Sequence, residues 1–368
     1  MKYYIIAGEA SGDLHGARLI EALCKIDSSA TIRCWGGALM ENAGGVLVKN
    51  YRDLAFMGFW EVISNLPTIL RNLRFCKKDI LAFQPDAIIY IDYPGFNLRI
   101  AAWAKKYNFP NHFYISPQVW AWKANRVRKM KQHLTALYTI LPFEKDYFLK
   151  NHQYAVYYVG HPLLDSIQKE SVEAAVPLLY PADEKPVIAL LPGSRKQEIQ
   201  KMLPLFLNLV PHFPNHQFVL AGIPSLGNDY YNHLIGNTPC QLLIGQTYPL
   251  LKIATAALVT SGTATLETAL FGVPQVVCYR TSAFSYWLAK QWVTLESISL
   301  VNLILEKKVV RELIQKECNP ISIQEAMEEI LTPRGRKLLL GHYKNLRQKL
   351  DQGGASKQTA QLIINSLS

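Results

Sequence analysis

Residues 2–23, KYYIIAGEASGDLHGARLIEAL, pass from an apolar run into a polar turn and then into a helical pattern. The run Tyr3–Ala7 predicts a short buried strand, and the apolar spacing within Leu14–Leu23 predicts a helix. A strand that passes directly into a helix is the repeating unit of parallel α/β sheets. This stretch therefore assigns the chain to the α/β class.

The same alternation continues along the 368 residues. Further strands are predicted at Ala87–Ile91, His112–Ile115, Leu137–Leu141 and Tyr154–Val159, and, in a second series, at Pro186–Leu191, Phe218–Ala221, Cys240–Ile244, Ala257–Thr260 and Gln275–Cys278. Helices are predicted at Val62–Ala82, Phe96–Tyr107, Asn125–His133 and in most of the gaps of the second series. The final stretch, Arg334–Ser368, is expected to be helical without a further strand.

The polar stretch Asp165–Lys185 separates the two series. We therefore expect two doubly wound parallel-sheet domains, 1–166 and 167–341, that face each other across a cleft. A tail, 342–368, is expected to pack back on the first domain. Ligands of such sheets bind outside the carboxyl ends of the strands, so the turns that follow strands are the candidate sites.

Composition favours a folded protein with an anionic partner. Hydrophobic residues make up 49% of the chain and the net charge is +11. The first 166 residues carry 20 Lys and Arg against 13 Asp and Glu. No apolar run reaches the ~20 residues that span a bilayer, and the N-terminal run is too short for a signal peptide. We expect a cytoplasmic protein whose six scattered cysteines are small buried hydrophobes.

The first turn, Gly8–Gly16, lacks the Gly-x-Gly-x-x-Gly spacing of dinucleotide-binding turns. Ser11 or Asp13 could cap the following helix, which is the structural alternative. One cap needs only one such side chain, and this turn holds Glu9, Ser11, Asp13 and His15. We therefore expect at least one of them to be functional.

Two further turns in the first half carry candidate groups. Asp92 follows an apolar strand and precedes Tyr-Pro-Gly, so it is either a general base beside a dry core or an ordinary turn residue. Trp120 and Trp122 follow a proline and precede a basic helix that begins near Arg126. They either pack in the core or line the cleft.

Two turns in the second half combine a strand end, small residues and a helix start. The first contains Gly193, Ser194 and Arg195, and the second is Ser261–Thr263, followed by Thr265 and Glu267. Free N–H groups at a helix start and an arginine suit phosphate, and a nearby carboxylate suits ribose hydroxyls. The second domain is thus the predicted nucleotide side.

The sequence has no Asp-x-Asp, no His/Cys cluster at metal spacing and no Gly-x-Ser-x-Gly. We expect no metal and no cofactor.

The stretch Leu54–Lys78 begins with Met57, Phe59 and Trp60 among other large apolar residues and ends with basic residues. It is a core helix or an interfacial patch for acyl chains.

Together these motifs resemble the lipid A disaccharide synthase family. They are AGEASGDLHGA, FMGFWEV, IDYPGFN, SPQVWAWKANRV, LPFEKDYF, VGHPLLD, LLPGSR and SGTATLETAL, in the family's order. The resemblance implies a GT-B fold and transfer of a sugar from UDP-2,3-diacylglucosamine to 2,3-diacylglucosamine 1-phosphate (lipid X), with release of UDP.

The resemblance also implies roles for individual residues. Asp92 would be the general base, with Asp13 or Glu9 as alternatives. UDP-sugar would contact Gly193, Ser194, Arg195, Ser261, Gly262, Thr263, Thr265, Glu267 and Asn302. The acceptor would contact Ser11, Gly12, Met57, Phe59, Trp60, Trp120 and Arg126. Gly95 stands where many relatives carry a second aspartate, and His15 is replaced in some relatives, which weakens it as the base.

The family also implies peripheral association with the inner face of the cytoplasmic membrane and a possible homodimer, and nucleic acid is not an expected partner. Two other functions fit the same residues. One is a UDP-GlcNAc epimerase of the same architecture, which needs no acyl-binding surface. The other is a basic lipid-binding module without turnover.

Overall fold

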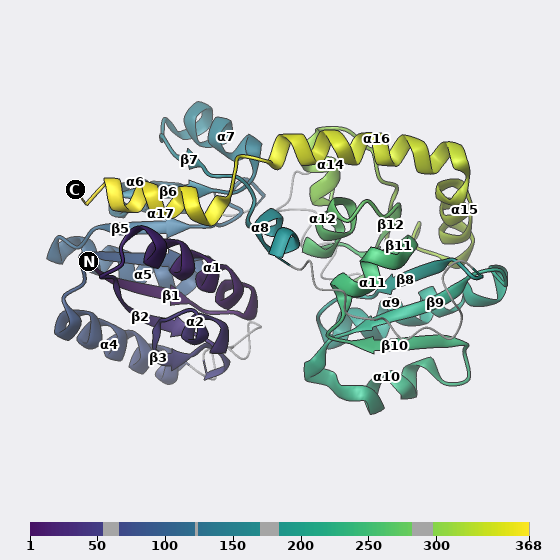
Figure 1. Cartoon of the computed structure of the whole chain (residues 1–368), viewed down its shortest axis with the longest axis horizontal. Coiled ribbons are helices and arrows are strands. Elements are labelled where there is room, and N and C mark those ends of the chain that lie inside the picture. The colour runs from purple at the N-terminus through teal and green to yellow at the C-terminus, as the bar shows by residue number, and fades with distance from the viewer. Residues whose placement is uncertain (54–65, 122–123, 170–183, 282–296, 368) are drawn as a thin grey trace. The chain divides into compact units, whose positions relative to one another are not determined.

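The computed structural model describes residues 1–53, 66–121, 124–169, 184–281 and 297–367. Met57, Phe59 and Trp60, which are predicted to contact the acceptor, therefore lie outside the described residues, as does Trp122. The chain forms two compact units, Met1–Asp165 with Asp351–Ser368, and Ser166–Leu350 (Figure 1).

The first unit is built on a seven-stranded parallel sheet in the order β3-β2-β1-β4-β5-β6-β7. Its strands are β1 (Lys2–Ala7), β2 (Thr31–Gly36), β3 (Val46–Asn50), β4 (Ala87–Ile91), β5 (Asn111–Tyr114), β6 (Ala136–Thr139) and β7 (Tyr157–Tyr158). Its helices are α1 (Ala10–Ile26), α2 (Ala38–Asn42), α4 (Leu66–Phe83), α5 (Pro94–Ala104), α6 (Arg126–His133), α7 (Pro142–His152) and α17 (Ala355–Asn365), and α8 (Pro162–Lys169) leads into the second unit. Short 3₁₀ turns lie at Tyr51–Asp53 and Lys105–Tyr107.

Both faces of this sheet are covered, which explains the continuous apolar runs in its strands. Tyr3 and Ile5 of β1 pack in one core with α1 and α17, whereas Tyr4 and Ile6 pack in another with α4, α5 and α6. Figure 1 shows α17 beside α1 on the same face. Alternate residues of one strand thus stabilise opposite layers.

The second unit has a six-stranded parallel sheet in the order β10-β9-β8-β11-β12-β13. Its strands are β8 (Val187–Leu191), β9 (Gln217–Gly222), β10 (Cys240–Ile244), β11 (Ala254–Thr260), β12 (Gln275–Tyr279) and β13 (Glu312–Ile314). Its helices are α9 (Lys196–Leu207), α10 (Gly227–Ile235), α11 (Thr247–Ile253), α12 (Thr263–Leu270), α14 (Leu300–Leu305), α15 (Pro320–Leu331) and α16 (Pro333–Leu350), with 3₁₀ turns at Val210–His212 and Pro224–Leu226.

The predicted α/β class with two doubly wound sheets is confirmed. Three strands escaped prediction. β2 contains Arg33, whose guanidinium Nη1 lies 3.1 Å from Oδ1 of Asp79 and interrupts the apolar run. β3 is a half-exposed edge strand, and β13 has only three residues. The predicted strand Tyr154–Val159 shrinks to two residues at the opposite edge.

The C-terminal part is helical, as expected, but it divides at a different residue. The sequence placed a separate tail from residue 342, whereas α16 runs unbroken to Leu350 within the second unit. Only Asp351–Ser368 belongs to the first unit, where the backbone N–H of Ser356 donates to Oδ2 of Asp165 over 3.0 Å. This bond holds the first turn of α17 against α8.

Candidate active site

Each sheet has one topological switch point, where chain connections leave in opposite directions. In the first unit it lies between β1 and β4, and in the second between β8 and β11. Ligands of open α/β sheets bind in the crevice at this point, outside the carboxyl ends of the strands. The turns after these four strands are those that contain Glu9, Asp92, Arg195 and Ser261.

The turn after β4 is held in an uncommon backbone conformation. Asp92 and Tyr93 have φ angles of 45° and 50°, and Ile115, after the neighbouring strand β5, has φ of 68°. Left-handed conformations are costly for residues other than glycine, above all for a β-branched one, and they cluster at functional sites. Asn97 stabilises the turn, because its Nδ2 donates to the carbonyl oxygen of Asp92 over 2.7 Å.

The turn after β1 lies against the turn after β4. A Cβ atom at Gly8 would fall within the ring of Tyr93, so only glycine allows this approach. Gly12 packs on Ala7 in the same way, with 3.0 Å between a Cβ built there and the Cβ of Ala7. The glycines of the first turn therefore bring the two strand ends together.

We expect Gly8→Ala to displace Tyr93 and the adjoining Asp92, and to lower the free energy of unfolding by about 1–3 kcal/mol, as overpacking does. Gly95→Ala, at the start of α5, is the matched control, because within the described residues no atom lies within 4 Å of a Cβ built there. Denaturant unfolding and kcat of both variants test this. Equal behaviour of the two would contradict the packing described.

The carboxyl group of Asp92 has the electrostatics of a general base. Burial, and after it the negative charge of Glu9, raise its pKa to about 6, although the backbone N–H of Tyr93 and the guanidinium of Arg126 act in the opposite direction. A base is most effective when its pKa lies near the working pH. Asp92, Glu9 and Arg126 thus form one electrostatic group at the switch point.

Asp13 has a structural position. It is buried, and its Oδ1 accepts hydrogen bonds from the backbone N–H groups of Gly37 (2.7 Å) and Met40 (3.1 Å). Its Oδ2 accepts one from Leu39 over 3.3 Å. Asp13 therefore caps α2. The structural alternative from the sequence, a cap on α1 itself, is wrong, because Glu9 occupies that N-cap position and no side-chain bond caps the helix within the described residues.

The remaining side chains of the first turn differ in access. Ser11 is exposed at the start of α1, so its hydroxyl is accessible to a ligand. Burial lowers the pKa of His15 to about 4. Burial also lowers the pKa of His161 to about 3, with a further contribution from His15. Both imidazoles are neutral near pH 7, so neither supplies a cation for a phosphate.

Trp120 is fixed by α7, a link that the sequence did not indicate. Its Nε1–H donates to Oε1 of Glu144 over 3.1 Å, and its ring meets Phe143 edge to face at 4.9 Å. The other oxygen of Glu144 accepts from the N–H groups of Ile140 and Leu141. Burial outweighs the opposing effect of these hydrogen bonds, so the pKa of Glu144 is raised to about 7. Glu144 thereby orders the loop that leads to Arg126.

We expect Glu144→Gln to lower the free energy of unfolding by about 1–3 kcal/mol, because one of its N–H partners then faces an amide donor. Trp120→Phe removes only the donor of the shared bond. A double-mutant cycle measured by denaturant unfolding should give a coupling above about 0.5 kcal/mol. Additive effects of the two substitutions would show that Glu144 does not hold Trp120.

In the second unit, the residues predicted to bind phosphate lie in the turn after β8, and most of them are exposed. Gly193 has φ of 116°, and a Cβ there would lie 2.7 Å from Oε2 of Glu198. Ser194 is exposed. Arg195 is the N-cap residue of α9; its side chain is 68% exposed and its Nη1 lies 3.5 Å from Oε1 of Glu198. The guanidinium is thus available at a helix N-terminus.

The turn after β11 is partly occupied by its own hydrogen bonds. Oγ of Ser261 donates to the carbonyl of Ile298 over 3.0 Å, and Oγ1 of Thr265 donates to that of Gly262 over 2.8 Å. Gly262 and Thr263 remain exposed at the start of α12. Ser261 and Thr265 therefore shape the turn, while the backbone N–H groups of the exposed pair are the accessible donors.

Glu267 and Asn302 lie in different surroundings. Glu267 is half-buried in α12, and its Oε1 accepts from the hydroxyl of Tyr248 on α11 over 2.9 Å. Asn302 is buried: its Oδ1 accepts from Val309 and Val310, and its Nδ2 donates to the carbonyl of Val310 and to Glu312. These side-chain hydrogen bonds of Asn302 fix α14 to β13 and to the residues just before it.

Tyr248 and Glu144 are the partners that sequence reasoning missed. Glu144 stands at the N3 position of α7 behind Pro142, which is a recognisable helix-start signal, but its bond to Trp120 spans 24 residues.

Among the described residues, no three His, Cys, Asp or Glu side chains gather as metal ligands. No helix in the described part of the chain has the length and apolar character to cross a membrane.

Comparison with known proteins gives a consistent result over the whole chain. Residues 3–363 match the model of the family described as lipid-A-disaccharide synthetase. The lipid-A-disaccharide synthase of Syntrophus aciditrophicus is 38% identical, over 98% of this chain and 96% of the relative. That of Idiomarina loihiensis is 36% identical over 100% and 98%.

Solved structures resemble the chain in fold. The UDP-GlcNAc 2-epimerase of Neisseria meningitidis, bound to UDP-GlcNAc, has a TM-score of 0.67 at 14% identity, and covers 100% of this chain and 99% of its own. The S. aureus MnaA–UDP structure has a TM-score of 0.71 at 13% identity, covering 100% and 96%. At such identities the likeness establishes the GT-B architecture alone.

Proposed function

The chain belongs to the lipid-A-disaccharide synthetase family and is a glycosyltransferase of lipid A biosynthesis, and from this premise we propose its substrates and mechanism. The donor is UDP-2,3-diacylglucosamine and the acceptor is 2,3-diacylglucosamine 1-phosphate. The acceptor's 6-hydroxyl oxygen attacks the anomeric carbon of the donor. The bond from that carbon to the UDP oxygen breaks, and a β-1,6-linked disaccharide 1-phosphate and UDP result.

The second unit binds the donor in this proposal. The support is the pair of turns at its switch point, where Arg195 and the starts of α9 and α12 present a guanidinium and free N–H groups. Negative charge grows on the leaving UDP in the transition state, and fixed positive ends of helices stabilise it. In this proposal Glu267 accepts hydrogen bonds from the ribose hydroxyls. Asn302 acts by holding α14, not by direct contact.

The first unit supplies the base. The observation that carries this assignment is Asp92, a half-buried carboxyl whose pKa is raised to about 6 in a left-handed turn at the switch point. Asp92 takes the proton of the acceptor hydroxyl as the new bond forms, which gives inversion in a single displacement. Glu9 tunes that carboxyl. Asp13, as the cap of α2, is a weaker alternative base.

The acceptor contacts are proposed at Ser11, Gly12, Trp120 and Arg126, with Arg126 near the 1-phosphate. Met57, Phe59 and Trp60 are proposed to meet the acyl chains; they lie outside the described residues. We further propose that the protein acts in the cytoplasm, at the inner face of the membrane, and that it can form a homodimer.

Two alternatives remain distinguishable by product. An epimerase would convert UDP-GlcNAc offered alone, and its support is the fold likeness to UDP-GlcNAc 2-epimerases. A basic lipid-binding module would release no UDP from any substrate. The experiment offers UDP-GlcNAc alone, then both diacylated substrates together. We expect UDP release only in the second case, and a C2-epimerised sugar nucleotide in the first would overturn the proposal.

A further inference from the structure

Helix α16 has one buried side and one strongly basic side. Its buried residues are Leu339, Tyr343, Leu346 and Leu350, which pack within the second unit against α12, α14 and α15. The helix holds six Lys and Arg between Pro333 and Leu350, and its sequence includes no Asp or Glu. Arg336 is turned inward, where its Nη1 donates to the carbonyl of Thr255 over 2.7 Å.

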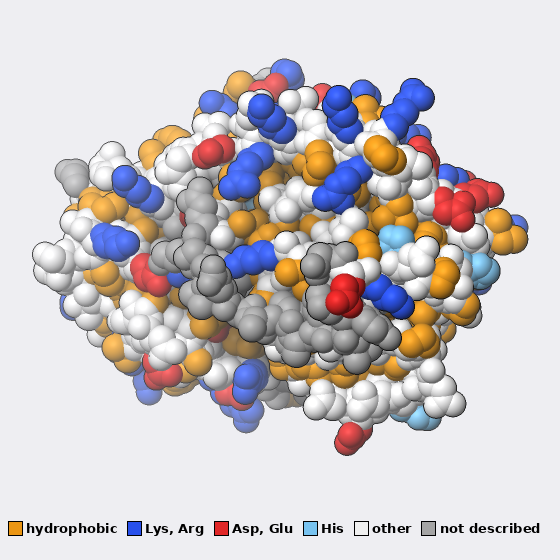
Figure 2. Space-filling model, turned by 45° about the vertical axis from the view of Figure 1, so that its right-hand side comes forward, with side chains coloured by type: hydrophobic (Ala, Val, Ile, Leu, Met, Phe, Trp, Pro, Cys, Tyr) orange, Lys and Arg blue, Asp and Glu red, His pale blue; other side chains and the backbone are white. Residues whose placement is uncertain are grey.

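The outward residues combine cations with an apolar side chain. Arg334, Lys337, Lys344 and Arg347 are exposed. Leu338, between them, is 63% exposed, which is high for a leucine of a packed helix. Figure 2 shows blue Lys and Arg side chains gathered along the upper part of that view, with orange hydrophobic ones between them.

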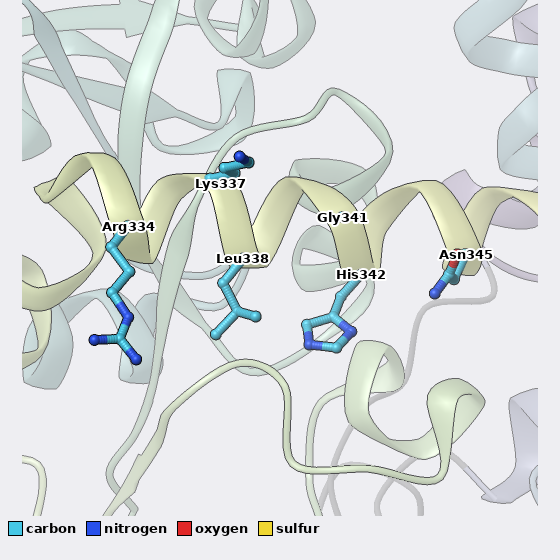
Figure 3. Close-up of a pocket in the computed structure, with 6 residues that line it drawn as sticks. All are labelled: Arg334, Lys337, Leu338, Gly341, His342 and Asn345. Atoms are coloured by element: carbon cyan, nitrogen blue, oxygen red, sulfur yellow. The ribbon is translucent and has the colours of Figure 1, made fainter.

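This side of the helix borders a hollow of about 540 Å³. Arg334, Leu338, His342 and Asn345 point to the same side of α16, with Gly341 opening space between them (Figure 3). Burial lowers the pKa of His342, and the nearby Lys307 lowers it further. The cations that line the hollow are Arg334 and Lys337. Leu338 lies beside them, and no carboxylate is among the lining residues.

We propose that the outward face of α16 docks on an anionic bilayer surface. Headgroup phosphates pair with Arg334, Lys337 and Lys344, and Leu338 enters the headgroup region. Basic segments gain about 1 kcal/mol per Lys or Arg at such a surface, and an apolar side chain adds to this. The choice of a lipid surface over another polyanion rests on the proposed function, because both proposed substrates carry acyl chains.

A second basic surface competes for this role. On α4, Leu70 and Phe75 are exposed beside Arg71 and Arg74. This surface lies within Leu54–Lys78, the stretch that the sequence predicted to be a core helix or an interfacial patch for acyl chains. The two surfaces lie in different units, so substitutions in one leave the other intact.

The test is sedimentation of the full chain with vesicles, which needs no turnover and is independent of the reaction assigned above. Lys337→Ala/Lys344→Ala should lower the partition coefficient on phosphatidylglycerol-rich vesicles about 25-fold, or about fivefold per lysine. Lys105→Ala/Lys106→Ala, which removes two exposed lysines of the first unit, is the charge-matched control and should bind within about twofold of the wild type. Pure phosphatidylcholine vesicles should bind none of these proteins tightly.

Three outcomes would overturn the proposal. The first is wild-type binding by Lys337→Ala/Lys344→Ala with loss of binding in Arg71→Ala/Arg74→Ala, which would place the contact on α4. The second is an equal loss in the Lys105→Ala/Lys106→Ala control, which would mean that net charge alone governs binding. The third is complete displacement from the vesicles by a random single-stranded RNA at matched phosphate concentration, which would mark a general polyanion surface.

Discussion

Asp92→Asn is expected to lower kcat by about 10²–10⁴-fold, the range of a general base, while UDP binds with unchanged affinity. Asparagine keeps the shape of the side chain and the hydrogen bond from Asn97 to the backbone carbonyl of residue 92. It cannot take a proton from the acceptor hydroxyl. Single-turnover kinetics and UDP titration of the variant measure the two quantities separately.

The pH dependence of kcat/KM tests the same assignment, because two substitutions near Asp92 should shift it in opposite directions. Because the ionised form of Asp92 is the active one, kcat/KM should fall below a pH of about 6. The charge of Glu9 raises that pKa and the charge of Arg126 lowers it. Glu9→Gln should therefore shift the acid limb to lower pH, and Arg126→Ala should shift it to higher pH. An acid limb that moves in neither variant would remove Asp92 as the titrating base.

Arg195→Ala is expected to lower kcat by about 10²–10³-fold, as loss of one preorganised transition-state donor does, and also to weaken UDP binding. Its guanidinium is exposed at the N-terminus of α9 and pairs loosely with Glu198, at 3.5 Å, so it can turn to a phosphate. Arg195→Lys keeps the charge but lacks the planar guanidinium, so its kcat should lie between those of the wild type and of Arg195→Ala.

Lys196→Ala is the matched control for Arg195→Ala. It removes a cation from the next residue, whose amino group lies 5.4 Å from the ring centroid of Tyr230. Its kcat should stay within about threefold of the wild type, since its charge is already directed to that ring. If Lys196→Ala and Arg195→Ala lose activity equally, the effect is one of general charge, and the leaving-group role of Arg195 is wrong.

Sequence reasoning located the fold and the turns because both depend on local pattern. Apolar runs such as Tyr3–Ala7 and Ala87–Ile91 marked buried parallel strands, and the polar turns after them marked the carboxyl edge. β1 and β4 are neighbours in the sheet, so their turns meet. The sequence marked both turns as candidate sites, but their meeting follows from this strand pairing, which the sequence analysis did not predict.

The roles of Asp13 and Asn302 depended on contacts that no local pattern carries. Asp13 precedes Gly37 by 24 residues, and its capping of α2 follows from the parallel pairing of β1 with β2. Asn302 bonds to Val310 and Glu312 across the loop between α14 and β13. Both side chains look free for chemistry in the sequence, and both are used to hold the chain.

The most direct test is nuclear magnetic resonance analysis of the product formed when the protein is given both UDP-2,3-diacylglucosamine and 2,3-diacylglucosamine 1-phosphate. The reaction proposed here predicts one molecule of UDP released for each new disaccharide, with a β linkage to the 6-hydroxyl oxygen of the acceptor. An α linkage, or UDP released by hydrolysis without a disaccharide, would contradict it.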